Sequence, residues 1–262
     1  MSIVSTGQGE EHERRPAAPL LEVLVLHPRD VAGAHEGGAD RLLVVDRVES
    51  GGLSPEPALV SAVCHETDLP VRAVLRLEDS YTATRSDLTR LTGLGEDYRA
   101  VGVEGVSFGF LTPDLTVDVE VCGHLADALA GLPWTFHRAF DASLETDLAW
   151  RQAAGLPGLD AVLSAGSARG LAAGHDELTD RAAADPVVAR LLMAGGGLRG
   201  EHVPWLVRAG VGQFHVASSV RPSGTWKAHV DVAHVRAWRL LLDDAADRAA
   251  GVEPWQPTGR SS

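Results

Sequence analysis

The seven residues TFHRAFD at positions 135–141 bring three side chains that could do chemistry into one short segment, namely His137, Arg138 and Asp141. The segment is apolar enough to form a strand, in which alternate residues share a face. A polar side chain at the end of a buried strand costs free energy unless it is paired or used. Two interpretations stay open: a salt-bridged strand end in which Asp141 also caps the next helix, and part of a catalytic site.

A second candidate is the carboxylate of Glu22, which stands in the strongly apolar segment LLEVLVL at residues 20–26. Burying Glu22 there requires a cationic partner, which Arg76 or His137 could supply. One interpretation is a buried structural ion pair. The other is a Glu–Arg–His cluster whose burial and charges shift the pKa values of its members, as acid–base catalysis needs. His215 also falls within a predicted strand and could point inward.

Three later segments are rich in glycine and serine, and each follows a predicted strand. Glycine lets backbone N–H groups approach an anion closely, and a helix N-terminus favours negative charge. Barrel proteins often bind phosphate in the loops after the seventh and eighth strands. We therefore predict an anion-binding site, with tight turns that bind no ligand as the alternative. The candidate residues are Ser164, Gly166, Gly195, Gly196, Gly197, Ser218 and Ser219.

Eight short apolar segments alternate with helical patterns along the chain. The predicted strands are residues 20–26, 41–45, 71–76, 105–111, 135–141, 161–164, 189–194 and 213–217. Continuous apolar character is typical of parallel strands buried on both faces, and about eight βα units in roughly 230 residues match a closed, single-domain (β/α)8 TIM barrel. An open doubly wound sheet is the alternative, although no GxGxxG follows the first strand. In a barrel, all carboxyl ends of the strands meet at one rim, which would gather the polar residues described above.

The predicted barrel covers residues 20–249. Residues 1–19 are polar and lack the apolar core of a signal peptide, so they are predicted to be a disordered tail. Residues 250–262 are rich in proline, glycine and serine and are predicted to be a flexible tail. Ser54 is the predicted N-cap of a helix that begins with Pro55.

Composition excludes several classes of protein. The 262 residues carry a formal net charge of −13, which argues against a nucleic-acid or anionic membrane surface. Since no run of 18 or more apolar residues occurs, no membrane span is expected. The two cysteines, Cys64 and Cys122, have no CxxC partner, which indicates a reducing, cytoplasmic location.

The residues themselves argue against a tight metal site. Copper(I) prefers the sulfur of cysteine and methionine. The chain offers Cys64, Cys122, Met193 and Met1, and both cysteines fall on predicted helices away from the barrel mouth. Eleven histidines are scattered without an HExxH motif. We therefore expect no high-affinity metal site built from these residues in one chain.

Residues 135–141 resemble the TFHRAFD signature of the CutC family, which is described as a family of copper homeostasis proteins. Other stretches agree with the family in the same order along the chain, so that the likeness covers roughly residues 20–245. These stretches are residues 21–23, 38–42, 51–55, 105–111 with Asp118, 193–197 and 214–219. The resemblance implies a TIM barrel, a cytoplasmic location, a homodimer and copper as a ligand. Carried over by position, the catalytic residues that it implies are Glu22, Arg76, His137, Arg138 and Asp141.

The chain departs from the family pattern where soft ligands are concerned. Many bacterial members have two cysteines at the positions of Leu24 and Val25, and a cysteine often stands at the position of Asp46. The family's Arg-Pro-Arg segment is reduced here to residues 76–79 (RLED). These differences remove sulfur from the barrel mouth and leave its histidine, arginine and anion-binding features in place.

Three functions follow as hypotheses. By resemblance, the chain is a cytoplasmic copper homeostasis protein that binds copper ion. By its residues, it is an enzyme acting on a small anionic, phosphorylated or similar substrate, with His137 as general acid or base and Glu22 orienting it. In that enzyme Arg76 and Arg138 bind negative charge. The third hypothesis is a barrel that has lost its chemistry and serves as a binding protein.

Overall fold

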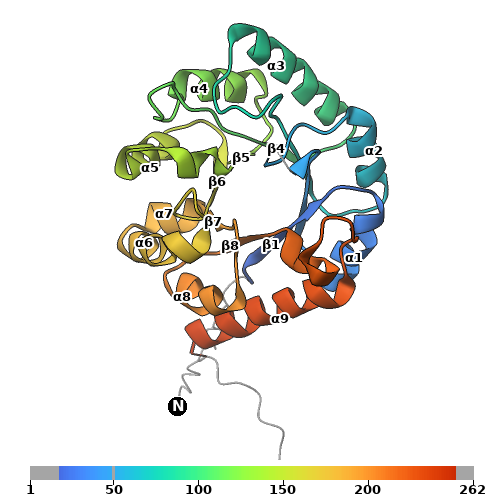
Figure 1. The fold of residues 1–262 in the computed structure, drawn as a ribbon, viewed down its shortest axis with the longest axis vertical. Helices are drawn as coiled ribbons and strands as arrows, with labels where there is room; N and C mark the ends of the chain where they lie inside the picture. Colours follow the sequence, from blue (N-terminus) through green and yellow to red (C-terminus); the bar gives the residue numbers. More distant parts are fainter. Residues whose placement is uncertain (1–17, 49–50, 252–262) are drawn as a thin grey trace, which may run out of the picture.

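The computed structural model describes residues 18–48 and 51–251. Its eight strands are all parallel and close into a ring in chain order, with β1 next to β8 (Figure 1). The predicted single-domain TIM barrel is therefore confirmed. The strands are β1 Leu20–Val25, β2 Arg41–Val44, β3 Val71–Val74, β4 Gly105–Phe108, β5 Trp134–Phe136, β6 Leu159–Ser164, β7 Leu192–Ala194 and β8 Gln213–Val216.

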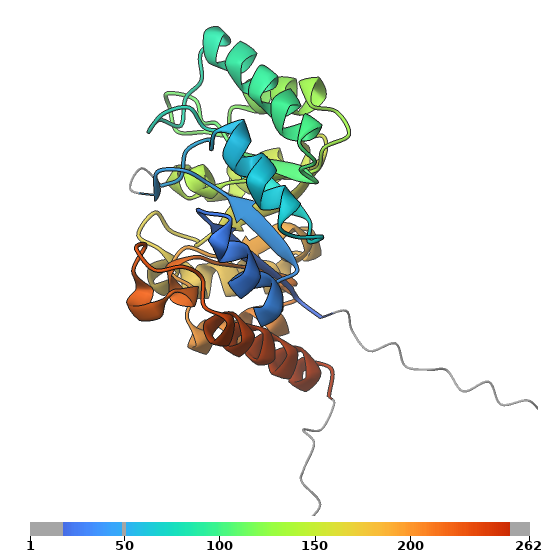
Figure 2. The same ribbon diagram turned by 90° about the vertical axis from the view of Figure 1, so that its right-hand side faces the viewer.

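Helices surround the strands on the outside of the ring, as the end view of Figure 1 and the side view of Figure 2 both show. Their apolar faces cover the outward-pointing aliphatic side chains of the strands, which form the main hydrophobic core. The last helix, α9, packs against α1 and α8 and so covers the point where the ring closes. The helices are α1 Arg29–Gly37, α2 Pro57–His65, α3 Arg85–Ala100, α4 Val119–Ala128, α5 Thr146–Ala154, α6 Leu171–Ala184, α7 Pro186–Leu191, α8 Val203–Arg208 and α9 Val232–Ala249.

The register between strands decides which residues share a level inside the barrel. Glu22 in β1 lies opposite Arg41 in β2 and opposite His215 in β8. Because side chains alternate along a strand, Leu24 points to the same interior two residues nearer the carboxyl end. A charged level and an aliphatic level are thus stacked inside the barrel.

The predicted fifth strand, residues 135–141, is too long. In the structure β5 ends at Phe136, and a 3-10 helix, Arg138–Ala142, follows His137. The expected alternation therefore stops at His137. This turn carries Arg138 and Asp141 back across the end of β6, where their partners lie.

Two other predicted boundaries are corrected. Helix α2 begins at Pro57 with Glu56 at its N-cap position, and Ser54 instead accepts a hydrogen bond from the backbone N–H of Arg76 at 2.8 Å. The first half of the predicted seventh strand is helix α7, whose Asp185 side chain caps it by accepting from Val187 N–H. An apolar run of six residues cannot by itself distinguish a buried helix from a buried strand.

Most of the two predicted tails, residues 1–19 and 250–262, lies outside the described residues, because only 18–19 and 250–251 of them are described. Within the described part of the chain, no helix combines the length and the apolar character that crossing a membrane requires.

Candidate functional site

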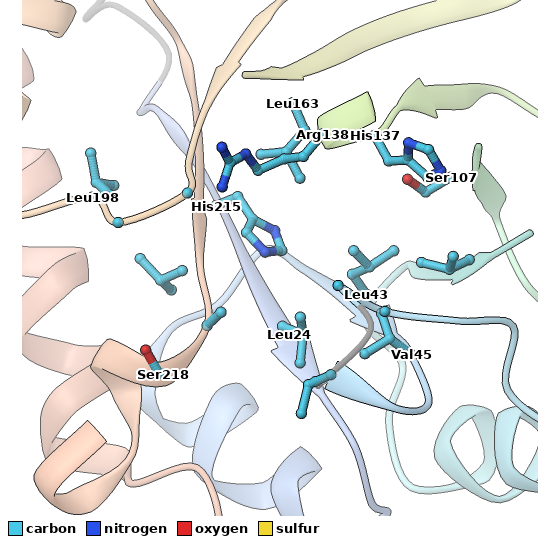
Figure 3. A pocket seen from close by; sticks show the side chains of 18 of the residues that line it. Leu24, Leu43, Val45, Ser107, His137, Arg138, Leu163, Leu198, His215 and Ser218 are labelled. Carbon is cyan, nitrogen blue, oxygen red and sulfur yellow. The ribbon is translucent and has the colours of Figure 1, made fainter. Parts of the chain in front are cut away.

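A cavity of about 650 Å³ opens at the carboxyl ends of the strands. Figure 3 shows side chains from opposite sides of the barrel pointing into it. Its volume is in the range of sites that bind small molecules. The predicted site residues that line the cavity are Arg76, His137, Arg138, Gly196, Gly197, Ser218 and Ser219. Those outside its lining are Glu22, Asp141, Ser164, Gly166 and Gly195.

Glu22 is completely buried below the cavity and holds two partners. Its carboxylate accepts hydrogen bonds from Arg41 Nε at 2.7 Å and from His215 Nδ1 at 2.8 Å. The prediction that Arg76 or His137 would pair with it is wrong, because strand register places β2 and β8 residues beside it. Burial raises the pKa of Glu22, but the charge of Arg41 and the hydrogen bond from His215 outweigh burial and lower the pKa to about 2. The carboxylate is therefore ionised at neutral pH.

The Glu22 carboxylate fixes the orientation of the His215 ring. An ionised carboxylate is an acceptor only, so Nδ1 of His215 carries a hydrogen directed at Glu22. The ring lines the cavity, and no hydrogen bond among the described residues uses its Nε2. A carboxylate behind a histidine fixes the tautomer and the orientation of the ring. Such an arrangement is chemically suited to acid–base work at Nε2, with Glu22 positioning the ring.

His137 is held in the opposite tautomer. Its Nδ1 accepts a hydrogen bond from the backbone N–H of Ala139 at 3.2 Å, so in the neutral ring Nε2 carries the hydrogen. Burial and then the charge of Arg76 lower the pKa of His137 to about 3. His137 Nε2 and Ser107 Oγ line the cavity as buried polar atoms that have no partner among the described residues. His137 is thus a neutral ring whose Nε2–H is available as a hydrogen-bond donor, and its low pKa makes it a poor general base.

We expect His137 to stay neutral throughout the range from pH 5 to pH 8. Long-range ¹H–¹⁵N spectra of the histidine rings should show one ring, absent from a His137→Asn variant, with a hydrogen on Nε2 and none on Nδ1. The physical reason is that charging this ring requires a second proton in a dry site beside Arg76. A His137 signal that titrates near pH 6.5 contradicts this assignment.

Arg76 reaches the cavity from the loop after β3. Its Nη2 contacts Asp79 Oδ1 at 2.7 Å, its Nε donates to the carbonyl of Ser80, and its guanidinium lies 4.9 Å from the ring centre of Tyr81. The side chain is almost fully buried. These contacts fix one positive charge beside His137, at the wall of the cavity.

The carboxylate of Asp141 binds the side chain of Arg138 and residues at the end of β6. It accepts from Arg138 Nε at 2.7 Å, from Ser164 Oγ at 2.6 Å and from the backbone N–H of Ala165. The prediction that Asp141 caps the next helix is wrong, because Glu145 occupies the N-cap position of α5. Asp141 is a positioning residue that holds the Arg138 guanidinium at the cavity, where Arg138 Nη2 also donates to the carbonyl of Ser167.

The glycine loop after β7 lies directly against this guanidinium. A Cβ atom on Gly196 would stand 2.5 Å from Arg138 Nη1, so only glycine leaves room for the arginine. Gly196 and Gly197 both have positive φ, and in the described part of the chain their N–H groups make no hydrogen bond. Two N–H donors and a guanidinium in one place are what an anion requires.

The remaining predicted anion-binding residues have other contacts. Ser164 Oγ donates to Asp141, and a Cβ on Gly166 would collide with the carbonyl of Gly174 in α6. A Cβ on Gly195 would meet Leu163 and His215. These three positions shape the fold around the site. The glycine loop was expected to open a helix whose N-terminus would favour a bound anion. In the structure, the 3-10 helix Gly200–His202 and the six-residue α8 start beyond the loop, so no helix N-terminus lies at the glycines.

Sequence reasoning missed Arg41 and did not pair His215 with Glu22. Both Arg41 and His215 are buried polar residues in apolar strands, as Glu22 is, and this shared feature was the available signal. Their assignment needed the register of β1 with β2 and β8, which no local pattern contains. Tyr81 and Trp226, which also line the cavity, lie in loops without any such signal.

The donor set gives little support to a metal centre. No group of three or more His, Cys, Asp or Glu side chains in residues 18–48 and 51–251 is arranged to hold a metal ion. Cys64 lies in α2 and Cys122 in α4, outside the cavity lining, as predicted. Burial raises the pKa of the Cys122 thiol to about 12, so it stays protonated.

Comparison with known proteins gives a consistent assignment. The model of the CutC family matches residues 19–220. The family protein CutC of Klebsiella pneumoniae (strain 342) is 29% identical over 254 residues, 90% of this chain and 99% of that protein. The human copper homeostasis protein cutC homolog is 27% identical over 217 residues, 78% of this chain and 76% of that protein. The crystal structure of the CutC protein from Streptococcus agalactiae aligns with 75% of this chain and with 97% of its own chain. The TM-score is 0.66 at 21% sequence identity, which shows that the two proteins share the fold. The chain belongs to the CutC family of copper homeostasis proteins.

Proposed function

We propose that this chain acts in copper homeostasis through a small organic anion bound at the barrel mouth, on which His215 performs proton transfer. The copper role is the one that the name of the human relative gives to that protein. The observation that carries the choice of ligand is the set of unpartnered polar groups on residues that line the cavity, namely His137 Nε2, Ser107 Oγ and the N–H groups of Gly196 and Gly197.

The catalytic roles follow from the hydrogen bonds. Glu22 accepts from His215 Nδ1 and stabilises the charged ring that forms when Nε2 takes a proton. His137 donates through Nε2 to an oxygen that gains negative charge during the reaction. Arg138, held by Asp141, and the glycine loop bind the acidic group of the substrate. This arrangement supports an enzyme more strongly than a barrel without chemistry.

Direct binding of a copper ion as cargo is the second candidate, and one observation favours it. His215 presents Nε2 to the cavity with a carboxylate behind Nδ1, which is the usual arrangement of a metal-bound histidine. His137 opposes it, because copper at Nε2 would displace the ring hydrogen to Nδ1 and break the hydrogen bond from Ala139. The cysteine and methionine sulfurs of the described residues lie outside the cavity lining. The pocket therefore offers copper one well-oriented nitrogen.

Two titrations of the purified, reduced protein separate these candidates. We expect copper(I) to bind more weakly than micromolar by calorimetry, and inorganic phosphate to raise the melting temperature. Phosphate at 100 times its dissociation constant stabilises the folded state by about 2.7 kcal/mol. Arg138→Gln should abolish the phosphate effect, and Arg151→Gln, on the exposed face of α5, should keep it.

Stoichiometric copper binding tighter than micromolar would refute the preference for an organic anion. If that binding survives in His137→Ala and is lost in His215→Ala, copper itself is the cargo. A protein indifferent to both copper and phosphate would support the binding protein without chemistry. A cytoplasmic location and a homodimer belong to the proposal as well and are testable by fractionation and sedimentation.

A further inference from the structure

The cavity has two chemically different sides, and a bare inorganic anion would use one of them. We propose that its ligand is an organic acid or phosphate with an apolar body, aryl or branched alkyl, whose acidic group lies at Arg138 and whose body lies against β1, β2 and β3. This inference rests on the anion-binding function proposed above and adds the class of substrate. In Figure 3, Leu24, Leu43 and Val45 lie on one side of the cavity and Arg138 and His137 on the other.

The apolar side is a cluster of its own. Leu24, Leu43, Val45 and Val74 pack together inside the barrel mouth, apart from the main core between strands and helices. All four line the cavity. They are at most 9% exposed, so they form a closed apolar floor. A ligand with an apolar body would cover this floor and remove its remaining contact with water.

Shielding the Glu22–Arg41 ion pair explains only part of the apolar surface of the cavity. Leu24 and Leu43 stand two residues after Glu22 and Arg41 on the same strands, and so keep water from that ion pair. That role does not extend to the rim, where Val48 packs against the cluster and Trp226 also lines the cavity, both beyond the ends of the strands. The apolar surface is larger than shielding requires.

Trp226 offers a face for a planar body. It lines the cavity, is 38% exposed, and its ring centre lies 5.5 Å from the guanidinium of Arg221. Arg221 is buried and bonded to Asp30 at 2.8 Å, which fixes the loop that carries the tryptophan. The aromatic wall is therefore held in place before a ligand arrives, which reduces the entropy cost of binding.

The proposed acid–base residue, His215, lies between the two sides. In Figure 3, His215 is placed between Leu24 and Arg138. A ligand that spans the cavity would present the atoms between its acidic group and its body to His215 Nε2. The volume of about 650 Å³ accommodates such a molecule and is far larger than a single phosphate needs.

Calorimetry with four probes tests the proposal: inorganic phosphate, phenyl phosphate, phenylacetate and phenol. We expect phenyl phosphate to bind at least tenfold more tightly than inorganic phosphate, since each buried methylene-sized group contributes about fourfold. Phenol, without the acidic group, should bind more weakly than either phosphate. The ratio between phenylacetate and phenyl phosphate shows whether the site selects a carboxylate or a phosphate.

Variants locate the two ends of the ligand. Val74→Thr, which keeps the shape of the side chain and replaces a methyl group by a hydroxyl, should lower the preference for phenyl phosphate severalfold and leave the affinity for inorganic phosphate unchanged. Val188→Thr, the same change at a buried position in α7 outside the cavity, should alter neither. Trp226→Ala should weaken the binding of phenyl phosphate. The control is Trp205→Ala in α8, which removes an exposed tryptophan that also faces an arginine and should leave the binding of phenyl phosphate unchanged.

Equal affinities for inorganic and phenyl phosphate would overturn this inference and leave the proposed anion site standing. If neither phosphate binds the wild-type protein, the proposed function itself fails. Tighter binding of phenyl phosphate that survives unchanged in both Val74→Thr and Trp226→Ala places the body elsewhere and also overturns the inference.

Discussion

Replacing Glu22 with glutamine is expected to lower the free energy of unfolding by about 3 to 5 kcal/mol, the usual cost of removing one member of a buried ion pair. The variant leaves the Arg41 guanidinium charged in a dry environment, where its Nη2 already has no partner among the described residues. It also removes the charge that holds His215 Nδ1. Chemical denaturation measures the change, and the melting temperature should fall by roughly 10 °C.

The pH dependence of this effect has a defined sign. The pKa of Glu22 falls from an ordinary 4.5 to about 2 on folding, so its stabilising contribution is complete above about pH 4.5 and is lost as the pH falls toward 2. The difference between wild type and Glu22→Gln should therefore shrink over that interval. Glu177→Gln is the matched control, because Glu177 pairs with Arg181 at the surface and is 52% exposed. Its cost should stay within about 0.5 kcal/mol.

A Glu22→Gln protein as stable as wild type at pH 7 would show that the ion pair contributes no net stability. A large loss of stability that persists unchanged at pH 2 would instead point to packing and not to charge as the cause.

Replacing Gly196 with alanine is expected to weaken phosphate binding at least tenfold while the barrel stays folded. The new Cβ would lie 2.5 Å from Nη1 and 2.6 Å from Cζ of Arg138. The end of an arginine side chain can move, so the guanidinium leaves its hydrogen bonds to Asp141 and Ser167 instead of the backbone unfolding. A lost hydrogen bond to a charged group is worth about 1.5 to 3 kcal/mol, which corresponds to a loss of tenfold or more.

The control for Gly196→Ala is Gly102→Ala. Gly102 has φ of +99° and would have nothing within 4 Å of a new Cβ, so its variant carries the backbone strain without the collision. Gly102→Ala should lose about 1 kcal/mol of stability and keep its phosphate affinity. Equal phosphate affinities of Gly196→Ala and Gly102→Ala would disprove the role of Gly196.

The architecture could be predicted from local patterns alone. Each strand buries both faces, so its apolar run is visible in the sequence, and the alternation with helices fixes the barrel. The segment at residues 135–141 was also recognisable as part of the site, because a histidine and an arginine at a strand end need partners. Its backbone was less predictable, since β5 ends at Phe136 and a 3-10 turn carries Arg138 and Asp141.

The sequence by itself determined that this chain is a (β/α)8 barrel of the CutC type and that its polar strand-end residues gather at one rim. Only the tertiary structure decided which of these polar residues pair with one another. Glu22 meets His215, 193 residues away, and not His137. The reason is physical: the alternation of side chains along a strand is local, whereas the level at which two strands face each other is set by the closure of the whole ring.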